Sequence, residues 1–580
     1  LDVRISGMPY IRTLNAKNIV DELEIFIISA MLLTSFIFFL FFRSFPATLI
    51  SMIVVIIGVM WAFGILGLLG YEITILTALI PPLIIVIGIP NCIFLINKFH
   101  QEVAKNNDKE SSLKTVIKKI GNATLMTNLT TANGFATFIL TDSQVLKEFG
   151  VVASINIMVI FLLSLLIIPI SHSFMNKPNK KFLKHLQNVK LKKFIDWMEE
   201  IVSYKRKKIF FISIFFLLIG FIGILKINVS GSIIEDMPKK SNFFKDILFF
   251  DQEFDGVVPI EIMINSKRKG GAIKLSTLRR IDKLEKYIND IPELSSPISQ
   301  VSGMKFIKQA YYNGNPKYYK LPTSQENRFI ATYLKNIDDP GSLMQNYIDS
   351  TSQFSRVTTF MKDIKTKRIE EIERDLLREI EIIFPSNQYE VRLTGKALMY
   401  LKGTYFLIEN LFISLFLAIL LIAIFMALMF KSLKMIVISL IPNLLPLIIT
   451  AGVMGFLGIP LKPSTILVFS IAFGISVDLT IHFLAKYRQE LIEKNGEKKL
   501  SVFSSLRETT ISMFYTSTVL FFGFAVFMSS NFGGTVALGG LISVTLLFAM
   551  FANLILLPSM LISMENYSNK KRIKKNNYQF

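Results

Sequence analysis

Cysteine and histidine are scarce in this sequence, and their scarcity excludes several kinds of site. The 580 residues include one cysteine, Cys92, so neither an intrachain disulfide nor a thiolate metal cluster can form. The four histidines are scattered and make no HExxH motif. Gly395 and Lys396 follow a predicted strand, but neither the earlier glycine nor the following Ser or Thr of a phosphate-binding loop is present. We therefore expect neither an enzyme nor a bound cofactor.

Charge is nearly absent from several runs long enough to cross a lipid bilayer. A spanning helix needs about 20 apolar residues. Hydrophobic residues make up 52% of the chain and the mean hydropathy is +0.49, more than a soluble fold of this size could bury. The sequence therefore predicts a polytopic α-helical membrane protein. The eleven runs lie at about 24–42, 47–70, 75–97, 122–142, 148–175, 208–226, 404–429, 435–458, 464–485, 509–530 and 535–563.

The net charge of +21 is concentrated in alternate loops between these runs. Loops such as 98–121 and 486–508 are rich in Lys and Arg, whereas the short loops of the opposite side carry only Lys147 and Lys462. Positive residues favour the cytoplasmic side of a membrane. This bias predicts a cytoplasmic C-terminus and an extracytoplasmic segment 227–403. The basic charge is thus explained by topology, and we expect no nucleic-acid partner.

The predicted helical unit occurs twice in the sequence, as two copies about 388 residues apart. Val3 to Gly7 matches Val391 to Gly395, and the offset then stays at 388 or 389 through five helices. Copies in the same orientation predict two parallel repeats related by an axis along the membrane normal. Further matches are Phe42-Arg43-Ser44 with Phe430-Lys431-Ser432, Gln101-Glu102 with Gln489-Glu490, and Gly134-Phe135-Ala136 with Gly523-Phe524-Ala525.

The repeat also predicts how the chain is divided. The second copy has a single span and an outer domain ahead of its five helices, so we expect the same elements before residue 1 and interpret the sequence as an N-terminally truncated fragment. The predicted parts are 1–23, the tail of a first outer domain; 24–175, a five-helix unit; 176–207, a basic cytoplasmic linker helix; 208–226, a single span; 227–403, an outer domain; 404–563, the second five-helix unit; and 564–580, a basic cytoplasmic tail.

The outer segment 227–403 reads as an α+β domain. Residues 258–265 and 388–394 alternate like strands, and 276–291 and 365–383 read as helices with charged outer faces. Strand–helix–strand units suggest a ferredoxin-like arrangement, the alternative being another small α+β fold.

The basic linker carries apolar residues at near-helical spacing. Phe194, Trp197 and Ile201 are examples, with lysines between the apolar positions. The pattern predicts an amphipathic helix on the anionic inner leaflet, and a solvated helical linker is the alternative.

An ionisable pair stands inside the span predicted at 464–485. Gly474, Asp478 and His482 are spaced i, i+4 and i+8, so they share one stripe of a helix. Ionisable residues inside spans are costly and usually functional. Burial disfavours the charged forms, so this pair could take up and release a proton as a relay. Gly474 would let a neighbouring helix approach closely. A buried Asp–His contact that only fastens helices is the alternative.

The first copy lacks this acid. One alignment of the copies puts Cys92 opposite Asp478, and another puts Pro90 there. Asn91 is the nearest polar residue; it could hydrogen-bond to Asp478 or serve only in packing. A proton site would therefore rest on the second copy alone.

Polar residues in the next span of each copy are candidates for contacts around the pair. Thr127 and Asn128 lie in the first copy, and Tyr515 and Thr516 in the second. Thr127 aligns with Thr516 at an offset of 389. Their hydroxyls could instead bond back to their own helix.

Two acids open their spans at nearly matching positions. Glu24 and Glu409 lie near the predicted outer surface, where they could form a gate between the membrane and outer domains. The alternative is a structural role, because a helix N-terminus tolerates an acid.

Together these marks resemble the resistance–nodulation–division (RND) superfamily, and within it the MMPL-type exporters. The resemblance covers the whole chain and is carried by the two-copy architecture, the Phe-Arg-Ser and Phe-Lys-Ser motifs, the Gly474-x-x-x-Asp478 box with His482, and Gly-Phe-Ala in the fifth helix. Spans 24–175 are also similar to the sterol-sensing domain of Patched-like proteins. The resemblance implies a porter domain at 227–403 and proton-driven efflux, with acids in the fourth and tenth spans as the relay. Asp478 matches the tenth-span position, whereas Asn91 and Cys92 depart from the fourth.

We therefore expect a multi-pass protein of the bacterial inner membrane that exports a lipid or other hydrophobic compound and is driven by an ion gradient, that of protons. Its expected partners are membrane lipids and a hydrophobic substrate, and it would work as a monomer or a homo-oligomer. The alternatives are a lipid- or sterol-sensing membrane protein that does not pump, and a protein-translocation accessory of the same superfamily.

Overall fold

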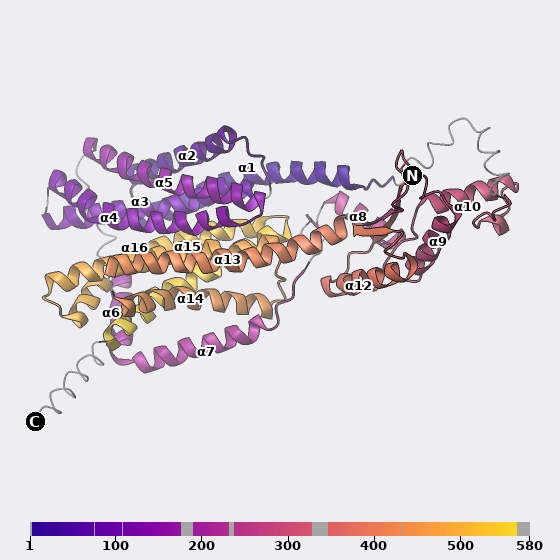
Figure 1. The fold of residues 1–580 in the computed structure, drawn as a ribbon. Coiled ribbons are helices and arrows are strands. Elements are labelled where there is room, and N and C mark those ends of the chain that lie inside the picture. The colour runs from indigo at the N-terminus through magenta and orange to yellow at the C-terminus, as the bar shows by residue number, and fades with distance from the viewer. Residues whose placement is uncertain are drawn as a thin grey trace, which may run out of the picture. The chain divides into compact units, whose positions relative to one another are not determined.

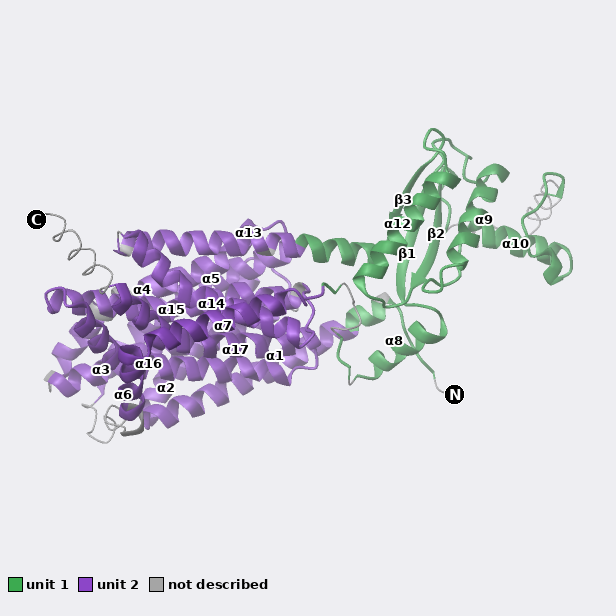
Figure 2. Cartoon of the chain, turned by 90° about the horizontal axis from the view of Figure 1, so that it is seen from below, with its two compact units in different colours: residues 1–13, 229–406 green, residues 14–228, 407–580 purple. Residues whose placement is uncertain are grey.

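The computed structural model describes residues 3–74, 76–106, 108–175, 189–230, 237–239, 241–326, 346–430 and 432–564. They form two compact units, shown in different colours in Figure 2. The outer unit comprises residues 1–13 and 229–406, and the membrane unit comprises 14–228 and 407–580.

The membrane unit is built from long helices that run roughly parallel to one another (Figure 1). We call α1–α5 the first half and α7 with α13–α17 the second half. The helices of the first half are α1 (Met8–Phe42), α2 (Phe45–Leu68), α3 (Ile80–Asn106), α4 (Lys109–Ala136) and α5 (Gln144–Phe174). Those of the second half are α7 (Arg206–Ile224), α13 (Lys396–Phe430), α14 (Leu433–Phe456), α15 (Pro463–Glu493), α16 (Lys498–Ala525) and α17 (Gly533–Phe551).

Short helical turns complete this unit: η1 (Thr77–Leu79), η2 (Thr137–Leu140), η6 (Val526–Ser529) and the π-helical turn η7 (Ala552–Leu556). Residues 557–564 continue as α-helix after η7.

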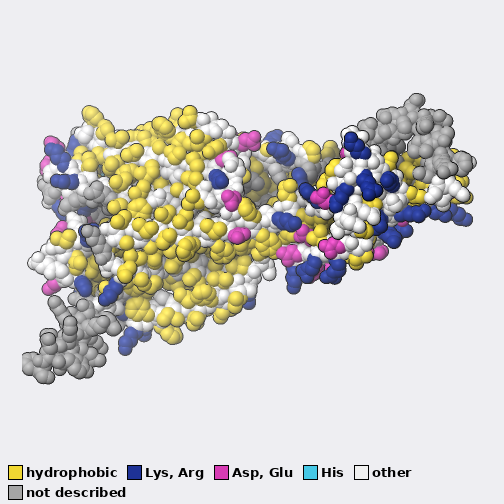
Figure 3. Space-filling view, viewed as in Figure 1, with side chains coloured by type: hydrophobic (Ala, Val, Ile, Leu, Met, Phe, Trp, Pro, Cys, Tyr) yellow, Lys and Arg dark blue, Asp and Glu magenta, His cyan; other side chains and the backbone are white. Residues whose placement is uncertain are grey.

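Ten helical segments of the described residues are long and apolar enough to cross a membrane. The predicted membrane class is therefore confirmed. The eleventh predicted run, 122–142, falls on α4 and η2. Residues such as Thr127 and Asn128 make this segment too polar to be recognised as a spanning helix from its composition. Nevertheless α4 packs against α5 and α15 inside the membrane unit. Hydrophobic side chains cover most of the visible face of the helices (Figure 3).

Two helices form the centre of the membrane unit. In the most apolar 18-residue stretch of α3 every residue is buried, and in that of α15 the buried share is 94%. In the corresponding stretches of α7 and α13 most residues are not buried. The halves meet where α4 packs on α15 and α3 packs on α16. Any ionisable side chain on the inner faces of α3 or α15 is thereby removed from lipid.

Glycines set the close packing of α7 on α14. A Cβ added to Gly223 would lie 2.3 Å from the carbonyl oxygen of Gly452, and one added to Gly220 would lie 2.9 Å from that of Ile448. Small residues allow such approach in a membrane, where helices associate by packing rather than by a hydrophobic driving force.

The outer unit contains a three-stranded antiparallel sheet in the order β2-β1-β3. Its strands are β1 (Val258–Asn265), β2 (Phe354–Met361) and β3 (Glu390–Thr394). Its helices are α8 (Asn242–Glu253), α9 (Leu275–Asn289), α10 (Gln300–Tyr311) and α12 (Thr366–Ile383), with the turn η5 (Pro316–Tyr318). Ile260, Ile262 and Ile264 of β1 are buried in a core shared with apolar residues of α9 and α12.

The two predicted strands and two predicted helices of this segment appear within two residues of their expected ends. Strand β2 was not predicted. Its buried positions alternate but include Ser355 and Thr359, so its inward face does not read as apolar. The ferredoxin-like arrangement stays a prediction.

The basic linker is described from residue 189 onward, and 176–188 lie outside the described residues. Helix α6 (Val189–Tyr204) buries Ile195, Met198 and Val202, and Glu199 forms an ion pair with Arg507 of α16 at 2.6 Å. The apolar stripe of α6 is therefore packed on the protein, while Trp197 remains about half exposed.

Candidate functional site

The predicted pair lies on the buried helix α15. The Oδ1 atom of Asp478 is 3.3 Å from Nε2 of His482, and the two side chains are 16% and 7% exposed. Neither atom has a hydrogen-bond partner among the described residues, because the contact between them is poorly aligned. The pair thus touches without satisfying its polar atoms, which is costly in a buried setting.

Helix α4 of the first half closes over this pair. Thr127 lies beside Asp478, and its hydroxyl donates to the Thr124 carbonyl of its own helix at 3.0 Å. One turn further on, the Thr131 hydroxyl donates to the carbonyl oxygen of Gly474 at 3.2 Å, and a Cβ added to Gly134 would lie 3.2 Å from the Gly474 Cα. The tight contact is at Gly134, because a Cβ added to Gly474 itself would lie 3.8 Å from the Thr131 carbonyl oxygen, so the packing role of Gly474 stays a prediction.

Helix α3 of the first half supplies an aromatic ring. Phe94 stacks on His482 with ring centroids 3.7 Å apart and an interplanar angle of 21°. Phe94 is the residue 388 positions before His482. The phenyl ring of the first half therefore stands at the position that corresponds to His482 of the second half, and the two rings stack on each other.

Asn91 occupies a different place from the one suggested by sequence. Its amide exchanges hydrogen bonds with that of Asn128, both at 2.9 Å, and Asn128 also donates to the Thr124 carbonyl. Since these bonds of Asn91 join α3 to α4 within the first half, they support its packing role rather than the suggested bond to Asp478.

Tyr515 and Thr516 lie on α16 with different surroundings. Tyr515 stacks on Phe41 of α1, with centroids 4.1 Å apart. The Thr516 hydroxyl donates to the Met513 carbonyl at 3.0 Å, which is the back-bonding alternative. Both aligned threonines therefore bond back to their own helices, and Thr127 is the one that lies beside Asp478.

The suggested gate residues Glu24 and Glu409 are both exposed. The buried acid at this end is Glu22, 8% exposed, which accepts hydrogen bonds from the Ser530 hydroxyl and the Asn531 backbone, each at 2.7 Å. Its counterpart 388 residues later, Asn410, accepts from the Asp142 backbone at 3.5 Å.

Those two contacts are reciprocal, because Asn531 and Asp142 are themselves 389 positions apart. In each, α1 or α13 of one half holds a loop of the other half. The sequence offset could have revealed this correspondence, but only the fold shows which of several nearby acids is turned inward.

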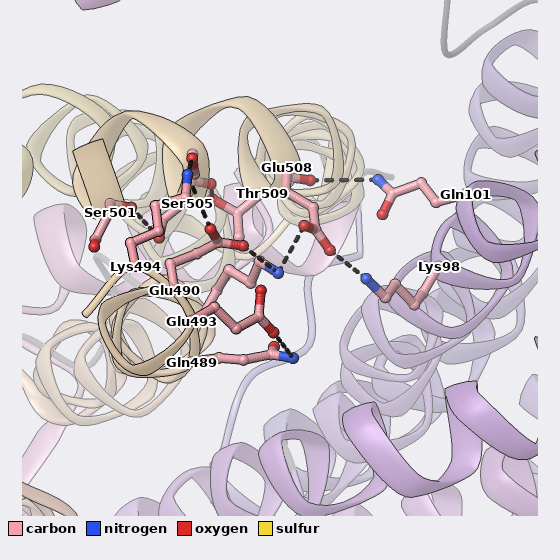
Figure 4. A network of polar contacts seen from close by, with 12 residues as sticks. Lys98, Gln101, Gln489, Glu490, Glu493, Lys494, Ser501, Ser505, Glu508 and Thr509 are labelled. Carbon is pink, nitrogen blue, oxygen red and sulfur yellow. Dashed lines mark hydrogen bonds and ion pairs between the residues drawn. The ribbon is translucent and has the colours of Figure 1, made fainter. Parts of the chain in front are cut away.

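The opposite end of the unit holds an ion-pair network that is not among the predicted site residues (Figure 4). Glu508 of α16 pairs with Lys98 of α3 and with Lys486 of α15, the latter at 2.7 Å. Each lysine also pairs with the acid four residues later, Lys98 with Glu102 at 3.2 Å and Lys486 with Glu490 at 2.8 Å.

The two lysine–glutamate pairs of this network can be recognised in the sequence, but Glu508 cannot. Lys98 and Glu102 match Lys486 and Glu490 at an offset of 388, as Gln101 matches Gln489. Glu508 has no acidic counterpart, since Lys119 stands 389 positions earlier. No local pattern indicates that Glu508 would lie between two lysines distant in sequence.

A cavity of about 100 Å³ extends from this network to His482 of the predicted pair. It is lined on α3 by Phe94 and Lys98, on α15 by His482 and Lys486, and on α16 by Ser512 and Glu508. The two residues of each helix are four positions apart, about one turn. The cavity therefore has a layer with His482 and, one turn away, a layer formed by the three ion-paired residues.

The fold and the site define a polytopic helical membrane protein with an Asp–His pair buried where its two halves meet. The chain belongs to the MMPL family of the RND superfamily, because the family model matches residues 1–171 and 358–579, about two thirds of the chain. The resemblance predicted from sequence is confirmed.

A relative supports the membrane assignment and adds no activity. A protein of Methanocaldococcus jannaschii named only as a membrane protein, MJ1562, is 24% identical over 384 residues, which cover 64% of this chain and 94% of the relative.

Proposed function

We propose that this protein is a proton-driven exporter of a lipid or other hydrophobic compound. The observation that carries the proposal is the Asp478–His482 pair, an ionisable pair inside a buried helix and in contact with the other half through Thr127 and Phe94. Ionisable groups in such places usually mark ion pathways.

The proposal includes an arrangement of two parallel repeats. It is supported by the reciprocal packing of the halves, since α4 lies on α15 and α3 lies on α16, and these helices are related by the sequence offset. The positive-inside bias places the C-terminus and the Lys98–Glu508 network on the cytoplasmic side and the outer unit, with its porter-like sheet, outside. The membrane would be the bacterial inner membrane.

The geometry suggests how a proton could move the helices. Protonation makes Asp478 neutral and gives its carboxyl a hydrogen to donate, which changes its contacts with His482 and with Thr127 of α4. Because the pair has unsatisfied polar atoms, a repacking of α15 on α4 could relieve the cost of one protonation state. The chain connections through α1, α7 and α13 would carry that change to the outer unit.

A proton gradient supplies enough free energy for such a change. A proton that crosses a potential of about 100 mV carries about 2.3 kcal/mol. This shifts an equilibrium between two conformations about 50-fold. The substrate would enter from the outer leaflet or the outer aqueous side, past the exposed apolar helices.

Asp478→Asn tests the proposal, because it keeps the shape and removes the titrating group. In proteoliposomes with an imposed pH gradient and a fluorescent lipid as substrate, we expect gradient-dependent transport to fall at least tenfold. Glu110→Gln removes an exposed acid from the same unit and should transport like the wild type. Full gradient-dependent transport by Asp478→Asn would refute the mechanism.

The second candidate is a lipid- or sterol-sensing membrane protein that does not pump. The neutral Asn91–Asn128 pair favours it, because the first half offers no acid where relatives in the superfamily are expected to have one. A wild-type protein that binds lipid but moves none, with or without the gradient, would favour this candidate.

A further inference from the structure

Glu508 is the central acid of the network at the cytoplasmic end in the proposed orientation. Its side chain is 19% exposed, and those of Lys98 and Lys486 are 11% and 13% exposed. Removing one partner of a largely buried ion pair is costly, because the remaining charge is left uncompensated. The Gln101 side chain adds a hydrogen bond to the Glu508 backbone carbonyl at 3.4 Å.

The pairing of Glu508 with Lys98 joins the two halves, since Lys98 belongs to α3 and Glu508 to α16. The pairing with Lys486 lies within the second half. A movement of the halves against each other therefore has to break the first ion pair and can keep the second. Glu508 would remain with Lys486 and would not become an isolated charge.

The cavity behind these residues is suited to water. Its volume of about 100 Å³ exceeds the roughly 10–15 Å³ that one water needs, and its walls offer polar partners such as Ser512, Gln489 and Thr509. His482 lines the same cavity, and its Nε2 has no hydrogen-bond partner among the described residues. A proton released there would meet water rather than hydrocarbon.

We propose that Glu508, Lys98 and Lys486 form an ionic gate at the cytoplasmic mouth of the cavity that reaches His482, and that this gate controls proton release to the inner side. The inference rests on the proposed function and extends it with an exit route. The Lys98–Glu508 pair lies one turn from His482, toward the inner solution, and when formed it narrows the mouth of the cavity. When the pair opens, a proton leaves the Asp478–His482 pair for cavity water and then for the cytoplasm.

The gate is single, although the structure has two similar lysine–glutamate pairs. Lys98 with Glu102 and Lys486 with Glu490 are matched by the sequence offset, whereas Glu508 stands opposite Lys119 in that alignment. The central acid thus comes from the same half as Asp478. A simple fastener of two equivalent halves would not require this asymmetry.

Thiol accessibility tests the gate directly. Cys92 is the only cysteine and is buried, so Cys92→Ser gives a background without reactive thiols. Ala485 lines the cavity, and Ala485→Cys introduces a thiol inside it. In inside-out vesicles, a membrane-impermeant maleimide should modify this thiol slowly when the gate is intact.

Opening the gate should speed that modification several-fold. Glu508→Gln removes the central negative charge of the gate. Lys98→Met breaks the same ion pair from the other side, because it removes the positive charge of the first half. Both should increase the labelling rate. Glu110→Gln is the matched control, because it breaks an exposed Lys114–Glu110 pair of the same predicted cytoplasmic side and should leave the rate unchanged. Each variant is first shown to elute as a folded protein in size-exclusion chromatography.

A second readout is the proton leak of proteoliposomes in the absence of substrate. Glu508→Gln should increase it, and adding Asp478→Asn should remove the increase, because the leak passes through the relay. Labelling of Glu508→Gln and Lys98→Met at the rate of the intact gate would overturn the gate even if transport is proton-driven. Faster labelling together with no proton-coupled transport in the wild type would keep the gate and remove the proposed function.

Discussion

His482 lies between an acid of its own helix and a ring of the other half. Asp478 is 3.3 Å from its Nε2, and Phe94 stacks on its imidazole. An aromatic stack contributes about 0.5–1.5 kcal/mol and restricts the orientation of the ring. The pair is therefore not a feature of α15 alone: the geometry of its imidazole depends on α3, and that of its carboxyl depends on Thr127 of α4.

Glu22 is another residue whose side chain links the halves. Its carboxylate holds the Ser530 hydroxyl and the Asn531 backbone amide, while its counterpart Asn410 holds a backbone amide with a neutral oxygen. We predict that Glu22→Ala lowers the unfolding free energy by about 2 kcal/mol, since hydrogen bonds to charged groups contribute roughly 1.5–3 kcal/mol. Thermal unfolding of the full chain in detergent measures this loss.

Glu22→Gln shows how much of this stability depends on the negative charge and how much on having a hydrogen-bond acceptor. It retains an acceptor oxygen, as Asn410 does, so it should lose less stability than Glu22→Ala. Glu24→Ala is the control, because Glu24 is exposed two residues away. Equal stability of Glu22→Ala and Glu24→Ala would show that the loop is held by other contacts.

Spacing within one helix explains which site residues could be predicted. Gly474, Asp478 and His482 share a stripe because of helical geometry alone. Thr127 could be predicted as a neighbour of Asp478 because it aligns with Thr516 at the offset between the two copies. Glu508 could not be found this way, since its partner Lys98 is 410 positions away and on a different helix. Glu24 is the predicted gate residue, whereas the buried acid is Glu22, because the sequence shows an acid at a span entrance but not which way it points.

At the scale of elements, α4 and β2 show where composition misleads. Both place polar side chains on buried faces: Thr131 of α4 bonds to the Gly474 carbonyl, and Thr359 of β2 bonds to the Ser295 carbonyl. Once a polar group is satisfied by a partner on another element, burial no longer carries its full penalty. A hydropathy pattern cannot anticipate that partner, whereas β1, with isoleucines inward, was predicted with its correct ends.

The crossing of α7 on α14 depends on glycines from both helices. A Cβ at Gly223 would lie 2.3 Å from a backbone oxygen, which no side-chain movement can relieve. We predict that Gly223→Ala displaces α7 and costs about 1–3 kcal/mol, the usual cost of overpacking. Unfolding in a denaturant series, followed by the fluorescence of a label on α7, measures it.

Gly64 of α2 is the matched control, because a Cβ there would meet nothing within 4 Å. Gly64→Ala should be neutral or stabilising by up to about 1 kcal/mol, since alanine favours helix more than glycine does. Equal effects of the two substitutions would mean that the α7–α14 contact adapts without cost.

At the scale of the whole membrane unit, the contacts that join the halves gather at three levels. Glu22 joins them at one end, Thr131 and Gly474 join them near the middle, and Lys98 and Glu508 join them at the other end. The proposed function needs these contacts to exist in two arrangements. If they only fasten the protein, fixing them covalently changes nothing.

A cross-link between the halves decides between these two roles. Asn97 of α3 and Ser512 of α16 are joined by a side-chain hydrogen bond, so Asn97→Cys with Ser512→Cys, in the Cys92→Ser background, puts two thiols on facing positions of these helices, and a gel shift shows the disulfide before transport is measured. We predict that oxidation of this double variant abolishes gradient-driven transport in proteoliposomes, and that reduction restores it. The reason is that a disulfide here prevents α3 and α16 from separating.

The control for this cross-link lies within a single half. The hydroxyls of Thr450 on α14 and Thr545 on α17 are 2.6 Å apart, so Thr450→Cys with Thr545→Cys forms a disulfide that joins two helices of the second half. If the halves move as bodies, oxidation of this pair leaves transport intact while oxidation of the pair between the halves stops it. Equal transport by both oxidised variants would show that the contact between α3 and α16 stays fixed throughout the cycle, and the movement would then have to lie within one half, at α15 on its own.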